Sequence, residues 1–269
     1  MMRASTGTEI SIRPIAALDE ATQAQMWALY EPHHNTDSAE FWERLATFDE
    51  VALFTRRSDR ALIGFCGIRH RVLELAAGGR VATFYMGLTY VEREWRSKAL
   101  IQRMVLRRTL GPLFSPRFRR VYFWADCLTY RPYLAMARNL CEYYPSRTRV
   151  APCEVREVIA KLGRTYYGDS FDQERGTVRK QNRRIKEHEA FVSVTDLQDP
   201  DIAFYMECNR EYDRGDGLIA ICPMGVLNLV HLLGRRVCKW VLTLTNPASR
   251  RRASRKSHTP AERDSLVAV

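Results

Sequence analysis

The sequence TFYMGLTYVEREWRSKALIQRMVL, residues 83–106, consists of a strand-like half, a polar turn and a helix-like half. The first half is apolar, β-branched and aromatic, which predicts a buried strand. The second half has apolar residues at helical spacing, Leu100, Met104 and Val105. The turn between them, 92–97, leads into the first turn of the helix, where backbone N–H groups lack intrahelical acceptors and the helix dipole adds partial positive charge. The segment therefore predicts either an ordinary strand-to-helix connection or a site for an anionic ligand.

The same segment resembles the acyl-CoA-binding signature of the GNAT (GCN5-related) N-acetyltransferases. In that family a strand ends in V-x-P-x-[YF]-R, and the following helix opens with R/Q-x-x-G-x-G/A. Val91, Trp95 and Arg96 fit the first phrase, although its proline is missing, and Arg96, Ala99 and Ile101 take the places of the second. Ala99 and Ile101 replace two glycines that let the backbone approach a pyrophosphate closely.

The resemblance covers residues 9–145 and implies an acyl-CoA-dependent N-acyltransferase, a transferase of groups other than aminoacyl groups. Such an enzyme moves an acetyl or longer acyl group from acyl-CoA directly to an amine in a ternary complex. The resemblance also implies an oxyanion site made by backbone N–H groups of a splayed strand near 87–89. The cofactor-binding residues that it implies are Leu88, Thr89, Val91, Arg96, Ser97, Lys98, Ala99 and Leu100.

Three further residues are candidates for the catalytic groups. Asp126 and Tyr133 have the spacing of the family's N-x-x-A-x-x-[LA]-Y phrase without its Asn and Ala, and the resemblance implies that Tyr133 protonates the departing thiolate. The alternative is that Tyr133 is a core aromatic with a hydrogen-bonded hydroxyl, in which case Tyr130 is the substitute. The general base is either Asp126 or Glu92, which both lie at strand ends, where carboxylates are also common turn residues.

The order of the predicted elements supports the same fold. Strands are expected at 9–15, 51–55, 61–75 and 83–91, with helices at 19–30, capped by Asp19, and after Ser38 as N-cap. These elements are followed by the helix of the segment 83–106, a central strand at 119–127 and a helix capped by Thr129. The order β-α-α-β-β-β-turn-α is the GNAT order. We therefore predict an α/β (α+β) protein with a GNAT-like mixed, mostly antiparallel sheet flanked by helices, plus a C-terminal α/β extension.

Four segments divide the chain. We expect a flexible N-terminus at 1–8, a GNAT-like acyl-CoA-binding domain at 9–150, an extension packed on it at 151–246, and a disordered basic tail at 247–269. In the extension, the charged stretch 172–189 predicts a solvated helix rather than a nucleic-acid site. The eighteen uncharged residues 217–234 predict a buried strand, 218–222, and a helix, 224–233. The alternative for them is a membrane-surface segment. A last strand is expected at 237–243.

Composition constrains the remaining questions. The net charge of +11 suits anionic ligands, and the tail contributes six Lys and Arg against two acids. The seven cysteines form no C-x-x-C pair, and the His33-His34 pair has no nearby ligands, so we predict no metal site and reduced thiols in the cytoplasm.

The expected partners are acyl-CoA and an amine acceptor, not nucleic acid. Peripheral membrane contact stays open, and the oligomeric state is undetermined. The alternative function is a non-catalytic GNAT-fold binding module that acts at a membrane surface or a protein partner through its apolar C-terminal region.

Overall fold

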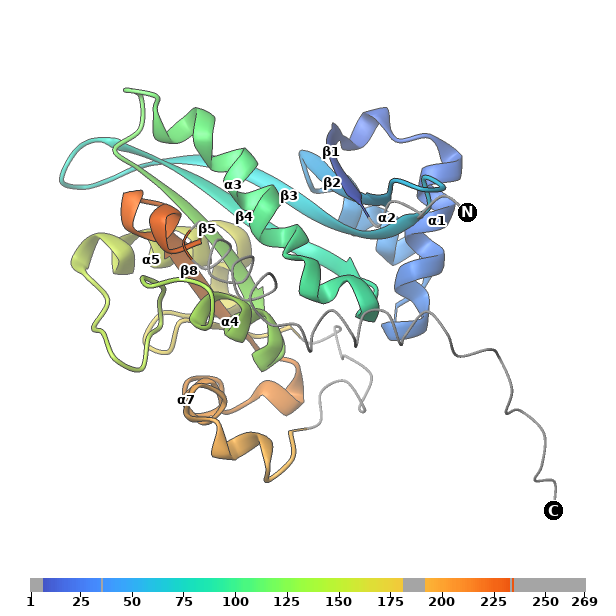
Figure 1. Ribbon diagram of the computed structural model, residues 1–269. Coiled ribbons are helices and arrows are strands. Elements are labelled where there is room, and N and C mark those ends of the chain that lie inside the picture. Colours follow the sequence, from blue (N-terminus) through green and yellow to red (C-terminus); the bar gives the residue numbers. More distant parts are fainter. Residues whose placement is uncertain (1–6, 35, 181–191, 233, 235–269) are drawn as a thin grey trace, which may run out of the picture.

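The computed structural model describes residues 7–34, 36–180, 192–232 and 234, and a mixed sheet of eight strands forms its centre (Figure 1). The strand order within these residues is β1-β2-β3-β4-β5-β8-β7-β6. The strands are β1 (Thr8–Pro14), β2 (Glu50–Arg56), β3 (Leu62–Glu74), β4 (Arg80–Val91), β5 (Arg120–Cys127), β6 (Phe171–Asp172), β7 (Thr177–Val178) and β8 (Gly217–Pro223). Only the β4–β5 pair among these is parallel. The predicted fold class, a mixed and mostly antiparallel sheet flanked by helices, is confirmed.

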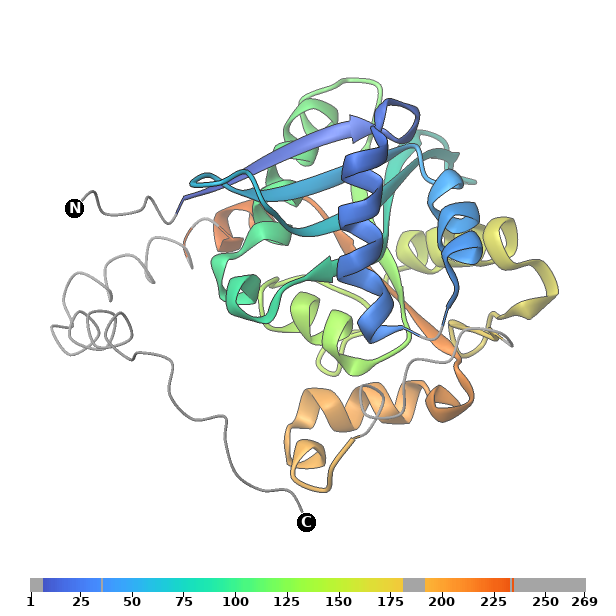
Figure 2. The same ribbon diagram turned by 90° about the vertical axis from the view of Figure 1, so that its right-hand side faces the viewer.

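Helices cover both faces of this sheet, as Figures 1 and 2 show from two sides. One apolar core contains residues of α3, α4 and α7, and the other contains residues of α1, α2 and α5. The helices are α1 (Glu20–Tyr30), α2 (Ser38–Ala46), α3 (Leu100–Leu113), α4 (Tyr130–Ala137), α5 (Cys153–Tyr167) and α7 (Pro200–Cys208), and a further helix spans 226–232. Alternate residues of the central strands enter the two cores, as expected for a sheet that is covered on both faces.

Three predicted N-cap residues can be compared with the observed N-termini of the helices. The carboxylate of Asp19 accepts the N–H of Thr22 at 2.7 Å, so the predicted cap of α1 is confirmed. The prediction that Ser38 caps α2 is wrong, because Asp37 has the extended backbone of an N-cap and accepts the N–H of Glu40 at 2.8 Å. Thr129 occupies the N-cap position of α4, but its side chain makes no capping hydrogen bond.

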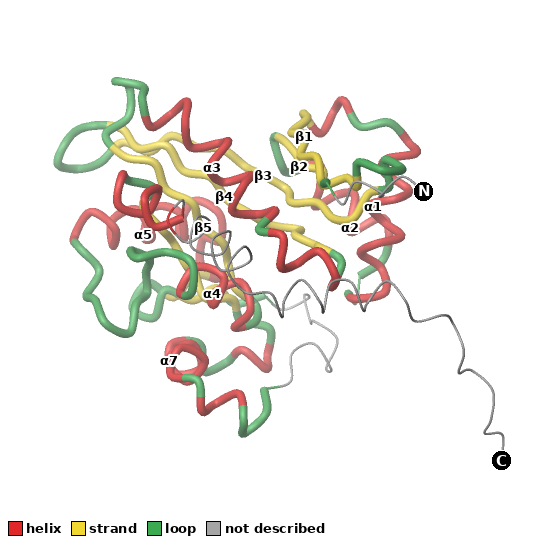
Figure 3. The backbone as a smooth tube through the Cα atoms, viewed as in Figure 1, coloured by secondary structure: helices red, strands yellow, loops and turns green. Residues whose placement is uncertain are grey.

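Strands β4 and β5 run side by side at one end and diverge at the other (Figure 3). Their pairing stops at Tyr85 and Trp124, and beyond this point β4 stays paired with β3 and β5 with β8. Just beyond this point β4 contains a bulge, since Leu88 and Thr89 together lie opposite the single residue Cys66. Leu88 has a φ of 44°, in the left-handed region. The bulge and the lost pairing open the sheet at its centre.

The C-terminal region belongs to the same sheet, because β8 pairs with β5 from Leu218 to Pro223 and β7 pairs with β8. The predicted strand and helix of 217–234 are thus observed. The predicted helix at 172–189 is wrong for its first part: 172–178 forms the β6–β7 hairpin, and Val178 is buried in the core. Pairing of β7 with β8 gave this part of the charged stretch an extended conformation instead of the predicted helix. Outside the described residues lie 181–189 of that stretch, the expected strand at 237–243 and the basic tail at 247–269.

A membrane-spanning helix of sufficient length and hydropathy is not found among the described residues.

The β3–β4 pairing depends on a glycine, so Gly64→Ala should destabilise the fold. A Cβ at Gly64 would lie 2.6 Å from the carbonyl oxygen of Tyr90 and 2.9 Å from Cα of Val91, and both atoms belong to backbone that cannot move freely. We expect a loss of about 1–3 kcal/mol in the free energy of unfolding, measured by urea denaturation. Gly111→Ala is the matched control, because a Cβ there would meet no atom within 4 Å apart from its chain neighbours, so we expect a smaller loss. Equal effects of the two variants would contradict this account.

Candidate functional site

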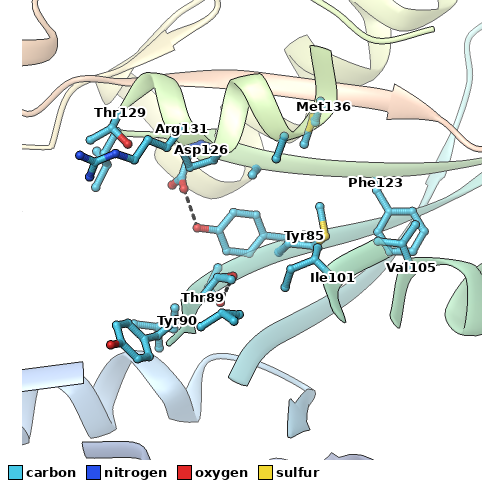
Figure 4. Close-up of a pocket in the computed structure, with 18 of the residues that line it drawn as sticks. Tyr85, Thr89, Tyr90, Ile101, Val105, Phe123, Asp126, Thr129, Arg131 and Met136 are labelled. Atoms are coloured by element: carbon cyan, nitrogen blue, oxygen red, sulfur yellow. Dashed lines mark hydrogen bonds between the residues drawn. The ribbon is translucent and has the colours of Figure 1, made fainter. Parts of the chain in front are cut away.

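A cavity of about 460 Å³ lies where β4 and β5 diverge (Figure 4). Its walls come from the β4 bulge, the end of β5, the first turns of α3 and one side of α4. Apolar side chains dominate these walls, among them Met86, Leu88, Ile101, Val105, Phe123 and Met136. The cavity contacts both faces of the sheet, since Phe123 belongs to the α3–α4 core whereas Tyr85 belongs to the α1–α2–α5 core.

The first turn of α3 borders this cavity. A short 3₁₀ helix, Arg93–Lys98, follows β4, and Ala99 with a φ of 53° turns the chain into α3. Arg96 and Gln102 line the cavity, and Nε of Arg96 donates to the carbonyl oxygen of Val91 at 2.9 Å, which holds the turn against the strand end. Ile101 forms part of the wall and does not fill the cavity. The first turn of a fourteen-residue helix thus borders an apolar cavity, an arrangement suited to the phosphates of a long thioester.

Two histidines that follow α1, His33 and His34, lie at the polar end of the cavity. Nε2 of His33 is 2.9 Å from the hydroxyl of Tyr90, and the two rings stack at 4.9 Å. His34 stacks on Tyr30 at 3.6 Å. The sequence held no signal for this role, because the strand residue Tyr90 lies 57 positions away from His33. Imidazole is the commonest general base in enzymes, so His33 is a candidate for that role.

Asp126 lies on the cavity wall, where Figure 4 shows it hydrogen-bonded to Tyr85. Its carboxylate accepts the Tyr85 hydroxyl at 2.7 Å and the Tyr167 hydroxyl at 2.5 Å, and forms a buried ion pair with Lys180. Burial alone would raise the pKa of Asp126, but the charge and hydrogen bond of Lys180 and the two hydroxyls outweigh burial and hold that pKa below its ordinary value. A carboxylate stabilised in this way is a poor proton acceptor. Its geometry favours a structural role at the centre of the site.

Five of the residues predicted for the site come together at this cavity, namely Leu88, Thr89, Val91, Arg96 and Asp126. Three predicted cofactor-binding residues do not line it: Lys98 is exposed, Ala99 turns the chain, and Leu100, the first residue of α3, is buried in the core. The side chain of Ser97 lies outside the described part of the structure. The strand-to-helix segment was thus located correctly, but which of its side chains turn inward depends on the 3₁₀ turn.

The structure places Tyr133 away from the cavity. Its side chain is fully buried, its hydroxyl donates to the carbonyl oxygen of Pro145 at 3.2 Å, and its ring packs on Tyr205 at 5.7 Å. The proposed acid role for Tyr133 is therefore corrected to that of a core aromatic. Tyr130 does not replace it, since it packs against the same core and does not line the cavity.

Glu92 also lies outside the cavity. It precedes the 3₁₀ helix, and its N–H donates to the carbonyl oxygen of Ile63 at 3.0 Å. This contact makes Glu92 a turn residue, the alternative that the sequence left open. Within the described residues, no group of three or more His, Cys, Asp or Glu side chains is arranged to hold a metal ion.

Comparison with known proteins finds similar solved structures at low sequence identity. Neither a protein-family model nor a curated protein matches the chain. Matching solved structures include the GNAT family N-acetyltransferase YhbS of Escherichia coli in complex with CoA, at 12% identity and a TM-score of 0.33, over 47% of this chain and 66% of that one. They also include Arabidopsis thaliana NAA60 with a bisubstrate analogue, at 13% identity and a TM-score of 0.34, over 50% of this chain and 86% of that one.

A third match is the aminoglycoside acetyltransferase meta-AAC0020 from an uncultured soil metagenomic sample, in complex with sisomicin. Its identity is 17% and its TM-score is 0.33, over 54% of this chain and 93% of that one. At these values the interpretation of the site depends on the contacts described above.

Proposed function

We propose that this protein is an acyl-CoA-dependent N-acyltransferase. The observation that carries the proposal is the opening between β4 and β5: a bulge at Leu88 and Thr89, an apolar cavity behind it, and the N-terminus of α3 at its edge. An acyl-CoA needs all three features, because its diphosphate suits a helix N-terminus, its thioester arm needs an apolar channel, and the tetrahedral oxyanion needs backbone donors.

The proposed reaction is direct transfer. The amine nitrogen attacks the thioester carbon, the C–S bond breaks, and an amide and a thiolate form. One proton must leave the amine and one must reach the thiolate. His33 is our candidate for accepting the first proton, and Tyr90, hydrogen-bonded to it at 2.9 Å, for returning one to the thiolate. Leu88 and Thr89, which are left out of strand pairing, are the candidate backbone donors for the oxyanion.

Isothermal titration with CoA, acetyl-CoA and longer acyl-CoAs tests this function. We expect saturable heat, with affinity that rises about fourfold for each methylene buried in the cavity, since a buried CH₂ contributes about 0.8 kcal/mol. Mass spectrometry of mixtures with amines should then detect the corresponding amides. If no thioester of any chain length produces heat, the transferase proposal is wrong.

A further inference from the structure

A second cavity, of about 480 Å³, lies beside the first. Four cationic side chains from three separate parts of the chain line it, Arg44, Arg69, Arg179 and Lys180, together with the hydroxyl-bearing Tyr85, Tyr166 and Tyr167. Arg44 and Tyr85 also line the first cavity, so the two spaces meet at these side chains. We refer to this space as the basic cavity.

Arg69 is held rigidly in the basic cavity. Its Nε donates to the carbonyl oxygen of Thr47 at 2.7 Å, and its Nη2 donates to the hydroxyl of the same residue. The guanidinium lies over three aromatic rings, at 5.1 Å from Phe48, 5.6 Å from Tyr85 and 5.0 Å from Tyr166. An arginine fixed by stacking loses little entropy when it binds a carboxylate or phosphate.

The charges of the basic cavity are unbalanced. Lys180 is paired with Asp126. In the described part of the chain, no carboxylate lies within ion-pair distance of Arg44, Arg69 or Arg179. The lining residues of this cavity include no acid. The like charges around this cavity repel each other, and a bound anion would offset that repulsion.

We infer, on the basis of the proposed function, that the basic cavity binds the acceptor of the acyl group. This acceptor is a small amine that also carries an anionic group, a carboxylate or a phosphate. The anion pairs with Arg69, Arg44 and Arg179, and the amine lies at Tyr85, where the two cavities meet. Its nitrogen forms the C–N bond while the thioester C–S bond breaks. The amine loses one proton, and the thiolate takes one up. The volume suits a small molecule.

Chain-matched acceptors test this inference in the full protein with acetyl-CoA as donor. One arm compares glycine, β-alanine, 4-aminobutyrate and 5-aminopentanoate with methylamine, ethylamine, propylamine and butylamine. A second arm compares O-phosphoethanolamine with ethanolamine. We expect at least a tenfold higher kcat/KM for the charged member of a pair. The arm that shows the effect identifies the anion as carboxylate or phosphate.

Arginine variants link this preference to the basic cavity. Arg69→Gln and the more exposed Arg179→Gln should each raise KM for the anionic acceptor tenfold or more and leave the dissociation constant of acetyl-CoA unchanged. That constant also reports whether the variant is folded. Arg117→Gln is the matched control, because Arg117 is exposed and lines neither cavity.

Equal transfer to charged and neutral amines, or KM values unchanged in both Arg69→Gln and Arg179→Gln, would overturn the inference and leave the proposed function standing. Absence of transfer to every amine, together with no acyl-CoA binding, would overturn both.

Discussion

Asp126→Asn is expected to lower the free energy of unfolding by about 3–5 kcal/mol. The side chains of Asp126 and Lys180 are 7% and 5% exposed, so the variant would leave a buried ammonium without its counter-charge. It would also replace the charged acceptor of two tyrosine hydroxyls by a weaker one. Urea denaturation at neutral pH measures the loss. This is the largest stability effect that we expect from a single polar substitution here.

The double variant Asp126→Asn/Lys180→Met is the control, because it removes both charges. It should recover part of the lost stability, since two neutral groups avoid the cost of one unpaired buried charge. A double variant that is less stable than Asp126→Asn alone would contradict the ion-pair account.

The stability contribution of Asp126 should depend on pH in a defined direction. Its folded-state pKa lies below the ordinary value, despite burial, because of Lys180 and the two tyrosines. The contribution is therefore complete above the unfolded pKa of about 3.9, and it is lost as the pH falls through the folded pKa. The difference between wild type and Asp126→Asn should thus be constant from neutral pH down to about pH 5 and shrink at more acidic pH.

Ala135→Trp is expected to reduce acyl-CoA affinity by at least tenfold while the fold stays intact. Ala135 lies on the exposed side of α4 and lines the cavity, so an indole there would occupy the space that the proposed thioester arm needs. Exposed positions tolerate such changes within about 0.5 kcal/mol of stability. Titration with acetyl-CoA measures the affinity, and thermal unfolding checks the fold.

Ala24→Trp provides the matched control for this experiment. Ala24 is also an exposed helical alanine, in α1, and it does not line the cavity. Unchanged affinity in Ala24→Trp together with a loss in Ala135→Trp would assign the binding site to the β4–β5 opening. Full affinity in Ala135→Trp would instead show that thioesters bind elsewhere or that α4 shifts to admit them.

The strongly patterned segments could be predicted from sequence because their signals are local. The apolar runs of β3, β4 and β5, the Asp19 cap and the element order follow from hydrophobic periodicity and capping chemistry between near neighbours. The turn before α3 was located for the same reason. Residues 172–180 were mispredicted because a two-strand hairpin owes its conformation to β8, about forty positions later.

The side chains of the site also divide into those that local sequence signals predicted and those that long-range contacts decided. Leu88, Thr89, Val91 and Arg96 were predicted from the family resemblance of one continuous segment, and they line the cavity. Tyr133 was not separable from a cavity residue by sequence, because a tyrosine on an apolar helix face can point to a core or to a ligand. Contacts with Pro145 and Tyr205 decided that it points to the core.

By itself, then, the sequence determined the order of strands and helices and the position of the strand-to-helix turn, since these follow from interactions within a few residues. Only the tertiary structure decided which groups face each other across the opened sheet. It brought His33 to Tyr90, Asp126 to Lys180, and three arginines to one cavity. The physical reason is that such contacts join residues separated by tens of positions, and their free energy exists only after the chain has folded.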